Sequence, residues 1–152
     1  ETISEEFQRV LSLEKICPHF HIPVQSASDT VLKGMRRRYN VSVLKEAVRS
    51  IRDARPQAFL AADIILGFPG ESDFDYQQSR DFLWEAGFAK YHVFSFSPRP
   101  GTPAVDMKPK VPERITRERS RELLALSERA RQRYVEGQVK AGAQSTLCPN
   151  AT

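Results

Sequence analysis

The sequence predicts an α/β fold, in which parallel strands alternate with helices, and three observations support this class. Apolar and polar residues alternate over 19–25, as they do in a half-buried strand. The most apolar run, 59–67, lies between turn-forming residues and fits a buried parallel strand. A third strand pattern covers about 91–97, and apolar residues at helical spacing fill the segments between the strands. Strands separated by helices pair in parallel through right-handed crossovers.

The helices between these strands have recognisable ends. Thr2 and Glu5 form the pattern of a capping box, and helical spacing extends this first helix to about Glu14. After the first strand, a short helix capped by Ser26 and Asp29 is expected. A longer helix is expected to begin at Ser42 and to end before Pro56.

The second half of the chain contains two further helices. Ser72 and Asp75 begin one that is expected to stop at Gly87. A long Arg- and Glu-rich helix follows over about 112–136, and the periodicity is lost beyond Gly137. Its expected apolar stripe consists of Ile115, Leu123, Leu126, Ala130 and Tyr134. The strand residues expected to face the helices are Phe20, Ile22, Ile64, Leu66, Phe94 and Phe96.

Composition limits the class of protein. A chain of 152 residues that is 40% apolar has enough material for one globular core. Its apolar runs are much shorter than the roughly 20 residues that cross a bilayer, so no membrane is expected as a partner. The acidic, polar start lacks the pattern of a secretory signal, which predicts a cytoplasmic location.

Cysteine and histidine do not form a metal-site pattern. Cys17 and Cys148 are too few and too far apart for a disulfide framework or a metal site, and each is expected to be a plain thiol. His19 and His21 share one face of the first strand, but no third ligand lies near them in sequence. We therefore favour an interior pair with satisfied hydrogen bonds over a metal site.

The candidate binding residues follow the strands. Gly67, Pro69 and Gly70 allow backbone amides to approach a planar or anionic ligand, although an ordinary strand-to-helix turn explains them as well. Arg99 stands between two prolines, as a fixed ligand contact or as a solvated side chain in a stiff turn. The polar loop 25–29 opens onto a helix N-terminus, which suits an anion or a ribose but is also explained by capping.

The net charge of +4 comes from arginines in two clusters, which suggests a polyanionic partner. One cluster is Arg36, Arg37 and Arg38, whose charge would also complement the end of a short helix. The other follows the long C-terminal helix and includes Arg114, Arg117, Arg119, Arg121, Arg129, Arg131 and Arg133. Two basic surfaces are expected.

Four segments together resemble a known family. They are Cys17-Pro-His-Phe-His-Ile-Pro-Val-Gln-Ser-Ala-Ser-Asp29, Met35-Arg-Arg-Arg-Tyr39, Asp63-Ile-Ile-Leu-Gly-Phe-Pro-Gly-Glu71 and His92-Val-Phe-Ser-Phe-Ser-Pro-Arg-Pro-Gly-Thr102. Their order and spacing are similar to those of radical-SAM methylthiotransferases over about 1–135. The opening is closest to the MtaB branch, which methylthiolates N6-threonylcarbamoyladenosine beside the tRNA anticodon. Ala27 departs from the usual Gln-Ser-Gly.

The resemblance implies a partial (βα)6 barrel, of which this chain contains the last three strands with their helices and a long C-terminal helix. The expected parts are the C-terminal half of the barrel (1–111), a long basic helix (112–137), and an irregular tail or the start of a truncated RNA-binding domain (138–152). Ligands of such barrels meet the carboxyl ends of the strands. The implied S-adenosylmethionine-binding residues are Gln25, Ser26, Asp29, Asp63, Gly67, Phe68, Pro69, Gly70 and Arg99. The implied RNA-facing residues, for tRNA as partner, are Arg36, Arg37, Arg38, Arg117 and Arg121.

The departures predict that this chain alone is inactive. The family holds a 4Fe-4S cluster with a Cys-x3-Cys-x2-Cys loop, and two distant cysteines cannot supply three ligands. The missing N-terminal portion of the enzyme is therefore an expected partner, and no residue of this chain is expected to be catalytic or to bind a metal.

Other interpretations stay open. The related branches that modify a ribosomal-protein aspartate or isopentenyladenosine are alternatives, although the His-rich first strand and the segment 92–94 weigh against both. A non-catalytic α/β module that binds RNA or protein is another. An exposed strand edge also predicts self-association, unless the long C-terminal helix covers the gap.

Overall fold

The computed structural model describes residues 4–13 and 15–142. Helices and strands alternate along the chain as predicted. Their order is α1 (Glu5–Leu11), β1 (His19–Gln25), α2 (Asp29–Gly34), α3 (Val41–Ala54), β2 (Phe59–Leu66), α4 (Asp73–Glu85), β3 (Lys90–Ser95), the 3-10 helix η1 (Pro103–Val105) and α5 (Glu113–Lys140). The predicted α/β class, with three strands and a long C-terminal helix, is confirmed.

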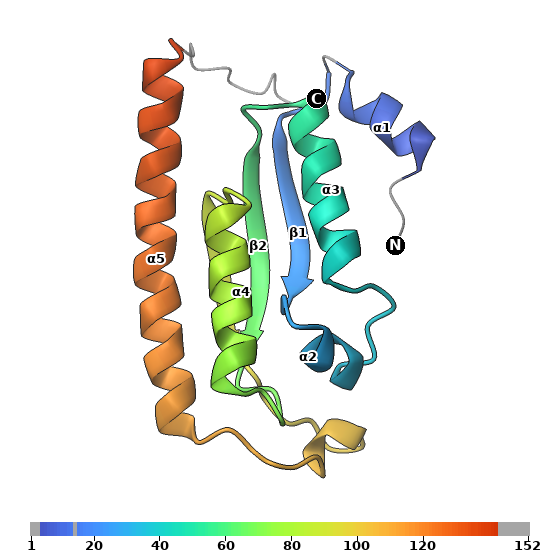
Figure 1. The fold of residues 1–152 in the computed structure, drawn as a ribbon, viewed down its shortest axis with the longest axis vertical. Coiled ribbons are helices and arrows are strands. Elements are labelled where there is room, and N and C mark those ends of the chain that lie inside the picture. Colours follow the sequence, from blue (N-terminus) through green and yellow to red (C-terminus); the bar gives the residue numbers. More distant parts are fainter. Residues whose placement is uncertain (1–3, 14, 143–152) are drawn as a thin grey trace.

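The three strands form one parallel sheet in the order β1-β2-β3. His21 pairs with Ala61, and Asp63 pairs with His92. Because all strands run the same way, their carboxyl ends lie at one edge of the sheet, at the end of the molecule where α2 is found (Figure 1). This edge therefore brings together the loops that follow each strand.

One face of the sheet carries the core. The even-numbered residues of β2, including Leu60, Ile64 and Leu66, are completely buried beneath the helices. Each such side chain contributes roughly 1.5–3 kcal/mol to the free energy of folding. The helical side of this core consists of Leu44, Val48, Ile51, Tyr76, Phe82, Leu83, Leu123 and Ala130. These residues come from α3, α4 and α5, which extend along the sheet in Figure 1.

Among the described residues, no helix packs against the centre of the opposite face. The residues of β3 on this face differ from those expected. Phe94 and Phe96 were expected to face the helices, but Tyr91 and Val93 do so instead, and Phe94 is 52% exposed. Tyr91 pairs with the buried Ala62, which fixes the alternation of β3. Apolar residues occupy both alternations of this strand, so the sequence pattern does not determine which face is buried.

Several helix starts also differ from the expected ones. The N-cap of α2 is Ser28 rather than Ser26, and that of α3 is Asn40, two residues before Ser42. Ser4 caps α1, which ends at Leu11, whereas the expected boundaries Thr2 and Glu14 lie outside the described residues. Polar residues with capping ability cluster at each start, and the backbone geometry selects among them.

The helices of the second half follow the predictions more closely. Ser72 and Asp75 form the capping box of α4, and Gly87 has the left-handed φ of 70° that ends it. However, α5 continues through Gly137 to Lys140, because Tyr134 and Gln138 both hydrogen-bond to Gln57 and hold the last turns in place. The expected boundary at 137 therefore falls inside a helix, and 143–152 lies outside the described residues.

The cysteines and the hydropathy of the helices are the last features of the fold. Cys17 is exposed just before β1, and Cys148 lies in the segment that the structure does not describe. Within the described ranges, no helix is both long enough and apolar enough to cross a membrane.

Candidate functional site

The loop after β2 is shaped by two glycines. Gly67 has a φ of 76° and Gly70 a φ of 88°, in the left-handed region that residues with a Cβ disfavour. The Gly70 amide donates to the carbonyl oxygen of Pro109 at 2.8 Å, and the Glu71 amide donates to that of Phe68 at 2.9 Å. The loop is therefore fixed by its own backbone and by the segment that precedes α5.

Glu71 lies beneath this loop and organises it. Its Oε2 atom accepts the Gly67 amide at 2.9 Å and Nη1 of Arg119 at 2.6 Å. The second guanidinium nitrogen of Arg119 donates to Oδ1 of Asp73 at 2.6 Å, and the guanidinium lies 5.1 Å from the centre of the Tyr76 ring. Burial raises the pKa of Glu71, while the Gly67 amide and the Arg119 charge oppose that increase.

The start of α5 packs directly on the same loop. A Cβ added to Gly67 would lie 2.4 Å from Oγ1 of Thr116, which is closer than a Cβ approaches non-bonded heavy atoms in proteins. Gly67 is thus required both by its φ and by the close approach of a helix that follows much later in the sequence.

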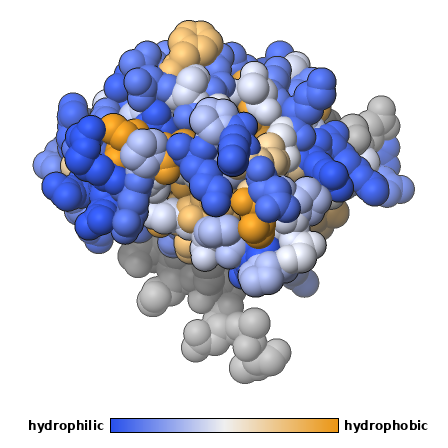
Figure 2. All heavy atoms as spheres, turned by 90° about the horizontal axis from the view of Figure 1, so that it is seen from below, coloured by the Kyte–Doolittle hydropathy of each residue, from blue (hydrophilic) through white to orange (hydrophobic). Residues whose placement is uncertain are grey.

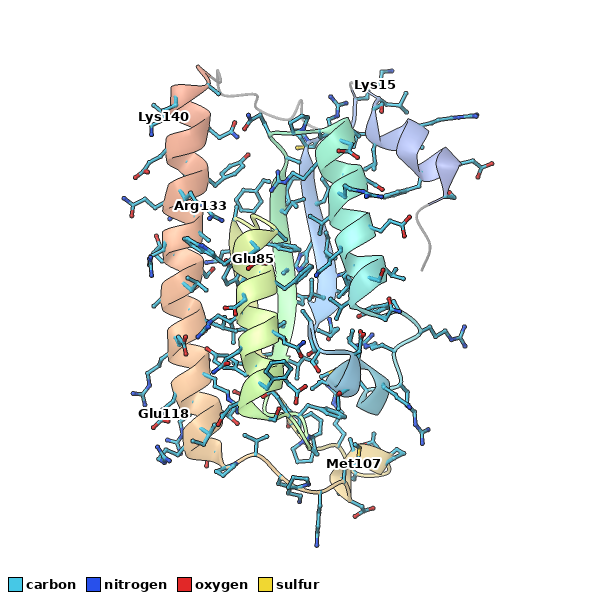
Figure 3. The ribbon with its side chains drawn as sticks, viewed as in Figure 1. Lys15, Glu85, Met107, Glu118, Arg133 and Lys140 are labelled. Atoms are coloured by element: carbon cyan, nitrogen blue, oxygen red, sulfur yellow. The ribbon has the colours of Figure 1, made fainter. Side chains whose placement is uncertain are left out.

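Two adjacent hollows open at this end of the molecule. The larger, about 530 Å³, is lined by residues that include Phe68, Phe96 and Met107, and Figure 3 labels Met107 near η1 at this end. The smaller, about 360 Å³, is lined by residues that include Gly67 and Pro69, and the two hollows share Phe96 and Ala104. Their sizes are in the range of small-ligand sites. Viewed from this end, the surface is mainly hydrophilic with apolar patches between the polar groups (Figure 2).

Basic side chains surround these hollows. Arg36 and Arg37 line the larger one, while Lys110 and Arg117 line the smaller. A third, shallower hollow of about 620 Å³ is lined by Asp29, Lys33, Arg36, Arg37, Arg38, Tyr39, Asn40 and Val43. The structure thus brings four of the five expected RNA-facing arginines to one end of the molecule. The fifth, Arg121, is exposed on α5 and lines none of these hollows.

The residues expected at the end of β1 have internal partners. Gln25 follows an irregularity in the strand pairing, has a φ of 61° and is buried. The Ser26 hydroxyl lies 3.3 Å from that of Ser79, and it accepts the Ser28 amide. Asp29 accepts the Val41 amide at 2.8 Å. Ser26 and Asp29 are therefore bound by internal hydrogen bonds, although Ser28 rather than either of them caps α2, and Gln25 has a left-handed backbone conformation of the kind that clusters at functional sites.

Asp63 lies on the uncovered face of the sheet. Its Oδ1 atom is 2.7 Å from Nε2 of His21, whose ring stacks on His92 with the centroids 5.0 Å apart. His21 is therefore hydrogen-bonded, as expected, but it faces outward in the described part of the chain. Arg99 is exposed, in the loop between β3 and η1.

The described residues do not fit an iron-sulfur cluster. No group of three or more His, Cys, Asp or Glu in 4–13 and 15–142 is arranged to hold a metal ion. The whole sequence contains two cysteines, fewer than the three thiolates that such a cluster requires.

Sequence reasoning missed Arg119, which was assigned to a basic surface but is 6% exposed. A signal for it was present. Thr116, Arg119, Leu123, Ser127 and Ala130 follow one another at helical spacing and form the buried stripe of α5. Polar residues in line with an apolar stripe indicate buried partners, here the Pro112 carbonyl for Thr116 and Glu71 for Arg119.

The sequence that forms the first two strands and the loops after them matches a known family. The family model of the radical SAM superfamily matches residues 2–83, which is more than half of the chain, and the chain belongs to that superfamily. The three-stranded sheet is consistent with part of its barrel.

Known relatives narrow the resemblance. A threonylcarbamoyladenosine tRNA methylthiotransferase MtaB of Treponema pallidum is 42% identical over 136 residues, which cover 90% of this chain and 28% of the relative. A tRNA-2-methylthio-N(6)-dimethylallyladenosine synthase of Mycobacterium marinum is 44% identical over 114 residues, 75% of this chain and 22% of the relative. An MtaB of Thermotoga maritima is 42% identical over 120 residues, which cover 78% of this chain and 28% of the relative. The predicted resemblance to radical-SAM methylthiotransferases is confirmed, and the chain spans about a quarter of the length of these relatives.

Proposed function

We propose that this chain is the cofactor-binding and RNA-facing part of a tRNA methylthiotransferase. The observation that supports this most directly is the meeting of two apolar hollows, a glycine-shaped loop and five basic residues at the carboxyl ends of the strands. Relatives named as tRNA methylthiotransferases match the chain across these same segments. The activity belongs to the complete protein.

S-adenosylmethionine fits the loop and the hollows. The amides of Gly67 and Gly70 have internal acceptors, but their loop lies beside the aromatic pair Phe68 and Phe96, whose ring centroids are 5.2 Å apart in an edge-to-face arrangement. Aromatic surfaces of this kind suit an adenine ring. In this enzyme class the cofactor supplies both the radical that removes hydrogen and the transferred methyl group. Gln25 and Arg99 are proposed to contact it from the ends of the neighbouring strands, and Asp63 from within β2. Ser26 and Asp29 are proposed to support the loop after β1.

The proposed substrate is an N6-modified adenosine of tRNA. The match to the threonylcarbamoyladenosine enzyme of Treponema pallidum extends over 136 residues, against 114 for the dimethylallyladenosine enzyme of Mycobacterium marinum. A dimethylallyladenosine enzyme of Corynebacterium efficiens matches over 129 residues, however, so coverage does not separate the two substrates. N6-threonylcarbamoyladenosine is proposed because the segment 17–21 is most similar to the MtaB branch. Nucleoside analysis decides between them: the complete protein should methylthiolate tRNA that carries the threonylcarbamoyl group, and modification of dimethylallyl tRNA alone would contradict the assignment.

The tRNA is proposed to bind over the basic end of the molecule. Phosphate contacts release counterions, so affinity should fall steeply as the salt concentration rises. We expect Arg36→Gln to weaken tRNA binding and to reduce the salt dependence, because Arg36 lines two hollows there. Arg49→Gln is the matched control, since Arg49 is exposed on α3. Binding that is insensitive to salt, or equal weakening by both changes, would contradict the proposed surface.

This chain alone is proposed to be unable to cleave S-adenosylmethionine, because its two cysteines cannot hold a 4Fe-4S cluster. Reconstitution of the purified chain with iron and sulfide should give no stoichiometric cluster absorption. Appearance of such a signal would refute this. Salt-dependent RNA binding without any S-adenosylmethionine binding would instead favour a non-catalytic RNA-binding module.

A further inference from the structure

α5 supports the loop after β2 from behind, and a single side chain makes the central contact. Thr116 packs on Gly67, and three residues later Arg119 reaches Glu71. We propose that Arg119 is a positioning residue for the S-adenosylmethionine-binding loop and acts through Glu71. This inference rests on the proposed function of that loop.

Burial distinguishes Arg119 from the other arginines of α5. Its side chain is 7% exposed and that of Glu71 is 1% exposed, whereas the Arg114–Glu118 pair on the same helix is 75% and 51% exposed. Removing two charges from water is costly, so a buried ion pair is a weak way to gain stability. A buried pair is better explained by the geometry that it imposes on its surroundings.

The geometry acts on the first peptide of the loop. One atom, Oε2 of Glu71, accepts both the Gly67 amide and the Arg119 guanidinium. Arg119 therefore fixes the position of this oxygen, and the oxygen fixes the direction of the Gly67 amide, where the chain leaves β2 in a left-handed conformation. Asp73 and the Tyr76 ring hold the guanidinium itself in place.

Arg119 does not reach the hollows directly. Neither Arg119 nor Glu71 is among the residues that line the two hollows at this loop. Gly67 and Pro69 line one hollow and Phe68 lines the other. The ligand would therefore contact the loop, and Arg119 would contact only the back of the loop. Its effect on binding must pass through Glu71.

The test compares Arg119→Gln with Arg131→Gln, an exposed arginine further along α5 that is not among the expected RNA-facing residues. Equilibrium dialysis with labelled S-adenosylmethionine gives the Kd of the chain, and hydrogen exchange by mass spectrometry reports the loop 67–71. Urea unfolding controls for global stability. If Arg119→Gln does not fold, the neutral double variant Glu71→Gln/Arg119→Gln removes the unpaired buried charge and is measured in the same way.

We expect Arg119→Gln to raise the Kd on the order of tenfold, the low end of what residues that orient a binding group from behind contribute. Exchange should accelerate at 67–71 and stay unchanged along β1 and β2, and Arg131→Gln should alter neither measurement. An unchanged Kd in a chain that binds S-adenosylmethionine would overturn the proposal. Exchange that rises throughout the core together with a lower unfolding free energy would also overturn it, because the role would then be structural only.

A failure of the proposed function can be distinguished from a failure of the positioning role of Arg119. If the unaltered chain does not bind S-adenosylmethionine, the cofactor role of the isolated chain is wrong. Hydrogen exchange then still decides the positioning role: faster exchange confined to 67–71 in Arg119→Gln supports it, and unchanged exchange refutes it.

Discussion

Gly67→Ala tests the contact between the loop after β2 and α5. The new Cβ would lie 2.4 Å from Oγ1 and 3.0 Å from Cγ2 of Thr116. Forcing this contact costs roughly 1–3 kcal/mol, as overpacking usually does. The left-handed φ of 76° adds about 1 kcal/mol for a residue with a Cβ. We expect the free energy of unfolding to fall by about 2–4 kcal/mol in urea titrations followed by circular dichroism.

Gly70→Ala is the matched control. Gly70 has a φ of 88°, but a Cβ there meets no atom within 4 Å, so only the backbone strain of about 1 kcal/mol applies. Thr116→Ala, introduced together with Gly67→Ala, removes both close atoms and should recover most of the difference between the two glycine variants. Equal losses for Gly67→Ala and Gly70→Ala would refute the packing argument, because the contact with α5 would then carry no measurable cost.

Three further predictions concern stability and association. Tyr91→Phe should raise the free energy of unfolding by about 1 kcal/mol, since within the described residues the buried Tyr91 hydroxyl has no hydrogen-bond partner; a loss would show that the hydroxyl is satisfied. Burial alone would raise the pKa of Asp75, but hydrogen bonds from Ser28 and Ser72 lower that pKa overall. The ionised form of Asp75 therefore stabilises the fold above about pH 4, and this contribution disappears as the pH falls through the lowered pKa. Asp75→Asn should therefore lower stability at pH 7 by about 1 kcal/mol and flatten the decline in acid; an unchanged acid limb in urea titrations would contradict this. The chain should self-associate through the β1 edge or the uncovered face of the sheet at micromolar concentration, and a strictly monomeric species in sedimentation velocity would contradict this.

The elements that the sequence predicted well are those in which local signals agree. The second strand combines a continuous apolar run with turn residues on both sides, and the structure places it at Phe59–Leu66. Ser72 and Asp75 satisfy each other within one turn, so α4 begins where the pattern indicates. Local chemistry was sufficient in both cases, because neither depends on a partner distant in sequence.

The features that were missed depend on distant partners. Arg119 looks like its exposed neighbours on α5 until Glu71 is brought beside it by the fold. The face of Phe94 is set by pairing between β2 and β3, because apolar residues occupy both faces of that strand. The last turns of α5 continue beyond Gly137 because Gln57, far earlier in the chain, accepts hydrogen bonds from Tyr134 and Gln138. Tertiary contacts override local preference at each of these places.

The contacts that Pro109, Thr116 and Arg119 make with the loop after β2 also affect when this loop can fold during synthesis. A ribosome completes β1, β2 and the loop 67–71 before it makes the residues that hold this loop in place. The carbonyl of Pro109, the methyl group of Thr116 and the guanidinium of Arg119 all follow later. The sheet can therefore begin to form on the ribosome while the Glu71 carboxylate still lacks its partner, and the loop reaches its final shape only after the first turns of α5 have emerged.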